Sequence, residues 1–356
     1  MQILIQGLLA AAALALFQEK DYIGAQACGA CHPTQLAGQA SSGHALSLRP
    51  AASHPLAKFF ISSGPLRRAP NFQFTLSLDV NRFKVRVSDG KSVAEMPIEW
   101  AFGSGSHAVT FVSQKDEDSY VEHHFTYYPA AGVLDATPGH QGLEARSLAA
   151  AFGVLYRTFD PDPTILRCFR CHSTGRLALG ERLEVMPAEP GVRCEACHGP
   201  GSFHAEAAGR GDSERARRSI QNPGRLRAVE LNEFCGSCHR KPLPPGVAVN
   251  WNDPWNTRHQ PLYLGQSACF LKSEGALSCL SCHQPHGALR RSEPSYYNER
   301  CAACHKDKTH PVVKTAATLE DCIGCHMPKA EPRKHLQFTN HWIGVYRDGA
   351  PLRPSR

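Results

Sequence analysis

Apolar and polar residues alternate strictly in one part of the chain. In the stretch NFQFTLSLDVNRFKVRVSDG, which begins at residue 71, every second residue is apolar over two runs. A period of two is that of a half-buried strand, and the closing Asp89-Gly90 pair is a turn signal. Similar pieces follow at 108–113 and 120–127. The pattern predicts a small antiparallel β insert over about residues 71–128.

The apolar spacing is different outside this insert. Between Leu143 and Tyr156 it suits a helix. Beyond that, short apolar pieces are separated by Gly and Pro, of which the chain has 29 and 26, and we interpret the charged stretch 210–227 as a surface loop. The expected fold class is therefore mainly α and irregular.

The chain begins with an apolar run from Ile3 to Phe17. This run is short for a transmembrane helix, and small residues precede a polar stretch, as in a secretory signal. Lys and Arg are absent from its first residues, which departs from the usual signal pattern. We expect residues 1–17 to be a signal peptide or an N-terminal anchor.

Seven copies of C-x-x-C-H contain fourteen of the fifteen cysteines. We number them motif 1 (Cys28, Cys31, His32), motif 2 (Cys168, Cys171, His172), motif 3 (Cys194, Cys197, His198), motif 4 (Cys235, Cys238, His239), motif 5 (Cys279, Cys282, His283), motif 6 (Cys301, Cys304, His305) and motif 7 (Cys322, Cys325, His326). C-x-x-C-H is the attachment sequence of a c-type haem, whose proximal iron ligand is the histidine. Zinc ribbons and disulfide scaffolds have no need for a histidine after each pair of cysteines. The motifs predict seven covalently bound haem c groups, with Cys269 left as a buried thiol.

Seven haems change how the composition is interpreted. They replace much of the side-chain core that 356 residues would otherwise need, so we expect a haem-packed body. The formal charge of +7 is offset by about −1 for each ferric haem with its propionates. The basic residues then fit propionate partners better than nucleic acid. We expect a multihaem cytochrome c domain over residues 18–345, a frayed polar tail over 346–356, and export to the periplasm or the cell exterior.

Twelve histidines lie outside the motifs, enough to give every iron a second imidazole. Methionine cannot serve generally, because only four exist and Met327 directly follows a proximal histidine. Pairs of imidazoles hold iron at a lower potential than His/Met pairs, which predicts a low-potential electron carrier. His123 and His124 are adjacent, so in a strand at most one could serve one iron.

The motif surroundings resemble a known superfamily. CEACHGPGSFH looks like an element of the multihaem cytochromes that include hydroxylamine oxidoreductase and pentahaem nitrite reductase. Further pieces resemble relatives often found beside tetratricopeptide repeats: CGACHPTQLAGQASSGHAL, FGSGSHAVTF, CLSCHQPHG and CIGCHMPKAEPRKHLQFTNHW. The resemblance implies a distal ligand role for His44, His107, His204, His286, His335 and His341. His310 completes a set of seven, with His259 and His54 as substitutes.

Two functions remain open at this point. One is electron transfer along closely spaced, mostly bis-histidine haems, with other redox proteins, quinol-oxidising membrane complexes or further copies of the chain as partners. The other is a haem-dependent oxidoreductase that acts on a small nitrogen or sulfur compound at one open haem. The chain has no C-x-x-C-K, so the Lys-ligated haem of the nitrite reductases is not expected.

Overall fold

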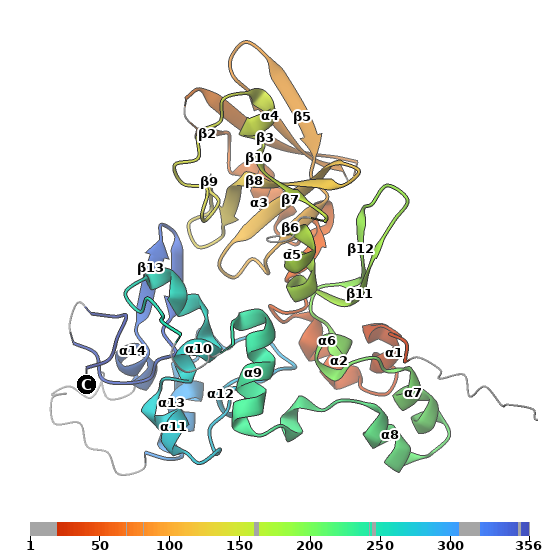
Figure 1. Cartoon of the computed structure of the whole chain (residues 1–356), viewed down its shortest axis with the longest axis vertical. Helices are drawn as coiled ribbons and strands as arrows, with labels where there is room; N and C mark the ends of the chain where they lie inside the picture. Colours follow the sequence, from red (N-terminus) through yellow and green to blue (C-terminus); the bar gives the residue numbers. More distant parts are fainter. Residues whose placement is uncertain are drawn as a thin grey trace, which may run out of the picture.

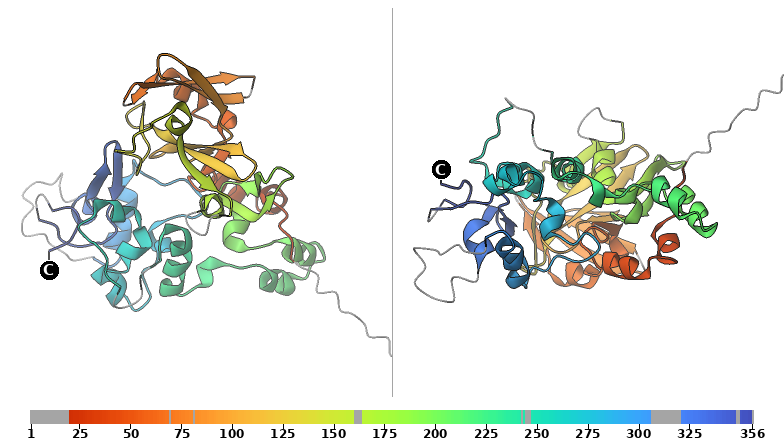
Figure 2. Two further views of the ribbon diagram at one scale, coloured as in Figure 1. Left: turned by 45° about the horizontal axis from the view of Figure 1, so that its top comes forward. Right: turned by 90° about the horizontal axis from the view of Figure 1, so that it is seen from below.

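The computed structural model describes residues 20–68, 70–80, 82–159, 164–241, 243, 247–305, 321–347 and 350–355. The expected signal segment 1–17 and the candidate ligand His310 lie outside these ranges. A β-rich part stands above two groups of short helices (Figure 1). Figure 2 shows the blue C-terminal elements and the green segment around residue 210 at opposite ends of the molecule. No helix within the described ranges has both the length and the apolar character needed to span a membrane.

The helices are short. In chain order the α-helices are α1 (Ala25–Gly29), α2 (Pro33–Ala40), α3 (Ala57–Ser62), α4 (Leu148–Ala151), α5 (Ile165–His172), α6 (Cys194–His198), α7 (Ser202–Gly209), α8 (Ser213–Ser219), α9 (Ala228–His239), α10 (Gln260–Leu264), α11 (Ala268–Lys272), α12 (Cys279–Cys282), α13 (Pro294–Ala302) and α14 (Cys322–His326). In the described part of the chain, three 3₁₀ turns join them, η1 (Ala51–Ser53), η2 (Pro223–Arg225) and η3 (Pro254–Arg258).

The strands of the described residues form four antiparallel sheets. The largest sheet has the order β1 (Leu48–Pro50), β6 (Trp100–Phe102), β7 (Val109–Asp116), β8 (Ser119–Tyr128) and β10 (Gly153–Arg157), with β9 (Val133–Ala136) also paired to β8. The second has the order β2 (Leu66–Arg68), β3 (Phe72–Asp79), β4 (Arg82–Ser88) and β5 (Val93–Pro97). The remaining sheets are the hairpins β11 (Ser173–Leu179) with β12 (Val185–Pro190) and β13 (Lys329–Arg333) with β14 (Leu336–Thr339).

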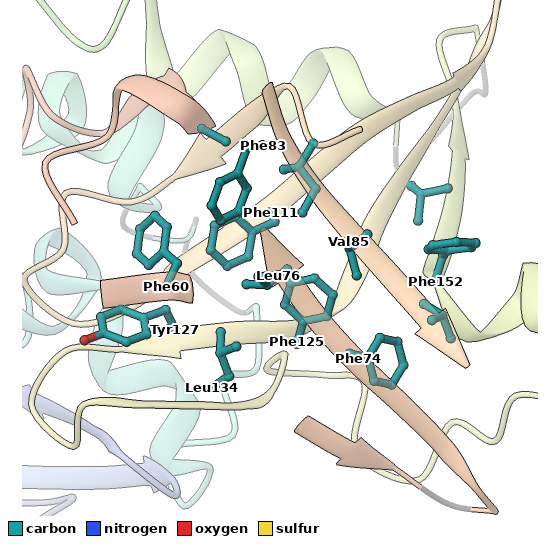
Figure 3. Packing of buried hydrophobic residues seen from close by; sticks show 14 of the residues in the cluster. Phe60, Phe74, Leu76, Phe83, Val85, Phe111, Phe125, Tyr127, Leu134 and Phe152 are labelled. Carbon is teal, nitrogen blue, oxygen red and sulfur yellow. The ribbon is translucent and has the colours of Figure 1, made fainter. Parts of the chain in front are cut away.

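The two large sheets pack face to face and enclose an apolar core. Alternate side chains of β3 and β4 point inward, and they meet Phe111 and Phe125 of the opposite sheet (Figure 3). Phe60 of α3 closes the edge of this core, with its ring 4.9 Å from that of Phe111. Strand alternation therefore produces a sandwich that is stabilised by side chains rather than by cofactors.

The expectation of a mainly α fold with a small β insert is wrong. Strands begin at Leu48, continue to Arg157, and recur as hairpins beside motifs 3 and 7, so β structure is nearly as common as helix. The alternation at 71–128 predicted β3, β4, β7 and β8, and the Asp89-Gly90 turn joins β4 to β5. The additional strands are three to seven residues long, and two of them, β1 and β10, pair with strands that are not their neighbours in the sequence.

Three further expectations are corrected. The stretch Leu143–Tyr156 contains only the short α4, after which the chain pairs as β10 with β8. Gly153 permits this because a Cβ there would lie 2.0 Å from the carbonyl oxygen of Glu122. The charged stretch 210–227 contains α8, which begins at the N-cap Asp212. The tail is also ordered in part, since Asn340 donates to the carbonyls of Pro351 and Leu352.

Candidate haem-binding site

Motifs 3, 5 and 7 begin short helices of their own, which are α6, α12 and α14. Motifs 2 and 4 end α5 and α9, and motifs 1 and 6 start in the last turns of α1 and α13. Side chains three residues apart fall on one face of a helix, so a helical turn presents both thiols of a motif together. Caps fix several of these turns: Thr164 accepts from Leu166 N at the start of α5, and Asp321 accepts from Gly324 N at the start of α14.

The motifs touch one another through their thiols. Cys28 contacts Cys194, Cys171 contacts Cys238, and Cys235 contacts Cys279. Cys301 of motif 6 contacts Cys322 of motif 7. Each contact joins different motifs, and the sequence separation reaches more than 160 residues between motifs 1 and 3.

Longer-range contacts complete the connections between motifs. Cys197 interacts electrostatically with both thiols of motif 4, and Cys301 with Cys282 of motif 5. The spatial order is therefore motif 1, 3, 4, 5, 6, 7, and motif 2 joins this line at motif 4. Helix contacts between α1 and α6, between α9 and α12, and between α12, α13 and α14 follow the same order.

Four motif histidines face a second imidazole. The ring pairs, with centroid distances and interplanar angles, are His32 with His204 (6.2 Å, 20°), His44 with His239 (6.0 Å, 61°), His198 with His286 (6.0 Å, 13°) and His283 with His341 (6.1 Å, 31°). An imidazole nitrogen lies about 2 Å from a first-row metal ion that it binds. The ring centre lies about 1 Å further, so two imidazoles on opposite sides of one ion have centroids about 6 Å apart. The four spacings fit an iron between each pair.

Backbone carbonyls orient several histidine rings through a hydrogen bond to one ring nitrogen. Nδ1 of the motif histidines His172, His198 and His326 bonds the carbonyl oxygens of Ser47, Gln221 and Gly344 at 3.0, 2.8 and 2.8 Å. His204 and His341 bond Ala216 O and Thr339 O in the same way, each at 2.9 Å. A carbonyl only accepts, so each Nδ1 carries the hydrogen and Nε2 is left as the metal-binding nitrogen.

Other histidines use both ring nitrogens within the protein. His54 bonds Gly103 O and Leu56 N, and His123 bonds Ser113 Oγ and Phe152 O. His124 and His140 bond each other and further acceptors, which we describe below. These rings have no nitrogen left for iron, and the structure gives them a role in the β sandwich.

Two predicted distal ligands lie apart from the motif histidines. Nε2 of His107 is 3.0 Å from the guanidinium of Arg291, and its ring contacts Phe338. Nε2 of His335 is 3.1 Å from Asp135 Oδ2. The substitute His259 lies between two guanidinium groups, those of Arg240 and Arg258.

His172 differs from the four paired motif histidines. Among the histidines that the structure describes, none has its ring paired with that of His172, whose edge packs on Phe102 with centroids 5.3 Å apart. Burial lowers the pKa of His172, as it does for His44 and His283. For His239 and His341 burial lowers the pKa to about 4. All five rings are therefore neutral at neutral pH, the form that binds a metal ion.

Comparisons with known proteins find similarity to cytochromes. A family model described as "Cytochrome c554 and c-prime" matches residues 156–199, which contain motifs 2 and 3. The chain is 27% identical over 158 residues to "Multiheme cytochrome MtrA" of Shewanella baltica, covering 34% of this chain and 44% of that protein. It is 21% identical over 379 residues to "Dissimilatory sulfite reductase MccA" of Wolinella succinogenes, covering 86% of this chain and 50% of that protein. The chain thus spans about half the length, or less, of these curated relatives.

A solved structure has the same fold. "Outer Cell Wall Cytochrome OcwA" superposes with a TM-score of 0.50 at 15% identity, over 90% of this chain and 79% of that one. In sequence and in fold, the chain is therefore similar to multihaem c-type cytochromes.

Proposed function

We propose that this protein carries seven haem c groups and passes electrons between them outside the cytoplasm. The observation that carries the proposal is the set of four imidazole pairs, each with ring centroids about 6 Å apart and each joining a motif histidine to one of the predicted distal histidines His44, His204, His286 and His341. An iron with two imidazoles has no open position, which suits electron transfer rather than substrate binding.

The chain's residues would perform three tasks in this function. Fourteen motif cysteines hold the porphyrins, and seven motif histidines provide one axial nitrogen each. Carbonyls such as Ser47 O and Gln221 O fix the ring orientation, and burial keeps the rings neutral. When bound, haem supplies an iron that gains and loses one electron without a change in covalent bonding.

The thiol contacts support one order for electron movement. Motifs 1, 3, 4, 5, 6 and 7 form an unbroken series, so electrons that enter at one end can leave at the other. Motif 2 is a branch on motif 4. The two ends of the series are the surfaces where we expect partner proteins to bind.

We expect those partners to be exported redox proteins, quinol-oxidising membrane complexes, or further copies of the chain in a haem assembly. The names of the relatives MtrA and OcwA, a multihaem cytochrome and an outer cell wall cytochrome, agree with a periplasmic or extracellular place. Nucleic acid is not among the expected partners, because haem propionates offset the formal charge of +7.

A redox titration of the purified holoprotein tests this function. We expect stepwise reduction over a broad, low range of potentials, and rapid reoxidation by an added cytochrome or quinone analogue. A protein that is reduced in a single step, or that turns over sulfite or a nitrogen oxide faster than it exchanges electrons with carriers, contradicts the proposal.

One observation favours a second function. Among the described residues neither His172 nor His305 has an imidazole partner, so the haems at motifs 2 and 6 are candidates for an open iron. The relative MccA is named a dissimilatory sulfite reductase, which makes a small sulfur or nitrogen compound the class to test. Binding of cyanide or sulfite to one haem of seven would favour this second function. If no haem binds either compound, electron transfer is the only function supported.

A further inference from the structure

A row of hydrogen-bonded titratable side chains crosses the six-stranded sheet. His124 Nε2 lies 3.2 Å from the carbonyl oxygen of Ala150, and its Nδ1 lies 3.1 Å from Nδ1 of His140. Nε2 of His140 lies 3.3 Å from Oε2 of Glu122. The same carboxylate oxygen accepts from the hydroxyl of Tyr156 at 3.0 Å. None of these groups belongs to the candidate iron ligands.

The bond pattern fixes where the hydrogens are. The carbonyl of Ala150 can only accept, so Nε2 of His124 carries a hydrogen. Burial, assisted by Arg68 and His140, lowers the pKa of His124 to about 4, so this ring is neutral and its Nδ1 accepts. His140 must therefore donate from Nδ1. In neutral His140 this leaves Nε2 as an acceptor.

That arrangement leaves two acceptors facing each other. Nε2 of neutral His140 and the ionised carboxylate of Glu122 cannot bond unless one additional proton lies between them. The proton can reside on His140, which gives an ion pair, or on Glu122, which gives a neutral pair. The structure thus holds a site for one proton between these two residues.

The network lies beside motif 2. Tyr156 packs with Leu166 of α5 against the cluster that contains Phe169, the residue after Cys168. Its hydroxyl is close enough to Cys168 for the two to interact electrostatically. Figure 1 shows α5 directly beside the sheet that contains β8 and β10. The porphyrin held by Cys168 and Cys171 would therefore lie next to the end of the network at Tyr156.

Among the described residues, Arg68, His123 and Cys168 are charged or titratable neighbours of the pair. Arg68 of β2 lies at the end of the network that His124 forms, and it donates to the backbone carbonyls of His124 and His140. His123 faces the other way, toward Ser113 and Phe152. Cys168 of α5 lies beyond Tyr156. The side chain of His140 is 6% exposed and that of Glu122 is 28% exposed, so water reaches the proton site through the carboxylate.

We propose that the His140–Glu122 pair takes up one proton when the haem at motif 2 is reduced, and releases it on oxidation. The step is balanced: the iron gains one electron from the neighbouring haem at motif 4 or from an added one-electron donor, and one proton enters from water. Added negative charge at the haem favours the proton bound beside it. The inference rests on the proposed haem at motif 2, and it makes this branch the place where electron transfer is linked to protons.

Spectroelectrochemistry of the holoprotein at several pH values tests the inference. In the wild type, the potential of one haem should shift by up to about 59 mV for each tenfold change in proton concentration. Glu122→Gln should reduce this shift to that of the remaining haems. Glu117→Gln, at the exposed turn between β7 and β8, removes the same charge outside the network and should retain the shift. A shift that persists in Glu122→Gln overturns the inference.

Two further experiments distinguish a failure of this inference from a failure of the proposed function. Cys168→Ala with Cys171→Ala should lower the intact mass by one haem and remove the pH-dependent haem from the titration. If Glu122→Gln does not fold, Tyr156→Phe removes only the hydroxyl bond to Oε2 and should move the pH at which the shift begins. An unchanged titration in that variant overturns the inference. A wild-type protein without seven haems contradicts the proposed function instead.

Discussion

His204 stacks on His32 and not on His198, although His198 lies only six residues away in the sequence. The rings of His32 and His204 are 6.2 Å apart at 20°, while His198 stacks on His286 at 6.0 Å and 13°. The short segment that contains Gly199 and Gly201 therefore joins two imidazole pairs. Glu195 of this segment accepts from the backbone of Ile23 and Gly24, which ties it to the start of α1.

Replacing His204 should open one iron. In His204→Ala we expect one haem to become high-spin or water-ligated, with attachment intact, because the thiols of motif 1 remain. Low-temperature EPR with intact mass measures both properties. His54→Gln is the control, since both nitrogens of His54 are bonded within the protein and its loss should not change the spin state. An unchanged spectrum in His204→Ala would remove this ligand assignment.

Thiol labelling counts the attached haems independently. In the denatured holoprotein, fourteen cysteines should be blocked as thioethers and only Cys269 should react with an alkylating reagent. The intact mass should exceed that of the polypeptide by seven haems of about 616 Da each. If a cysteine other than Cys269 is labelled, its motif would be removed from the count of attached haems.

The core between the two large sheets should lose stability when one of its central rings is removed. Phe111 is fully buried, and its ring contacts Phe60, Phe83 and Phe125. Phe111→Ala should lower the free energy of unfolding by about 3–5 kcal/mol. Phe59→Ala, in which the same side chain is 55% exposed, should cost much less. Chemical denaturation followed by circular dichroism compares them, and equal losses would contradict the packing described.

Acid should weaken the β sandwich through His123. Burial lowers the pKa of His123 to about 3, whereas an unfolded histidine titrates near 6.5. The unfolded chain therefore binds more protons between these values, and the free energy of unfolding falls as the pH drops from about 6.5 toward 3. The slope from this residue is at most about 1.4 kcal/mol per pH unit.

Denaturation midpoints at pH 7, 6 and 5 measure this slope. In His123→Gln, the stability at pH 7 reports the lost packing and bonds, and the difference between pH values reports the titration. We expect a shallower pH dependence in the variant. Parallel curves for the variant and the wild type would show that His123 does not titrate as described.

The sequence predicts those parts of the fold that repeat a local pattern. The apolar alternation at Phe72–Leu78 and Phe83–Val87 predicts β3 and β4, because one face of each strand is buried. Strands such as β1 and β10 are too short or too irregular to show a period, and their partners are distant. The helix expected at Leu143–Tyr156 fails because pairing of Gly153 with His123 outweighs the helical spacing.

The candidate site divides in a similar way. Each motif can be recognised from the sequence because its cysteines and histidine lie within five residues. The histidine that faces each motif histidine is set by tertiary contacts instead. His44, for example, faces His239, almost two hundred residues later. His107 and His335 are in stretches that resemble the family, yet they contact Arg291 and Asp135. The Glu122–His140 network gives no local signal, because its members come from separate segments.

The most direct test of the central claim is the low-temperature EPR spectrum of the oxidised holoprotein, with spins counted per chain. We predict at least four low-spin ferric irons with two imidazoles each. The 61° pair of His44 and His239 should differ in its signal from the near-parallel pairs, because ring orientation sets the splitting of the iron orbitals. A spectrum dominated by high-spin iron, or a protein without bound iron, would contradict the account.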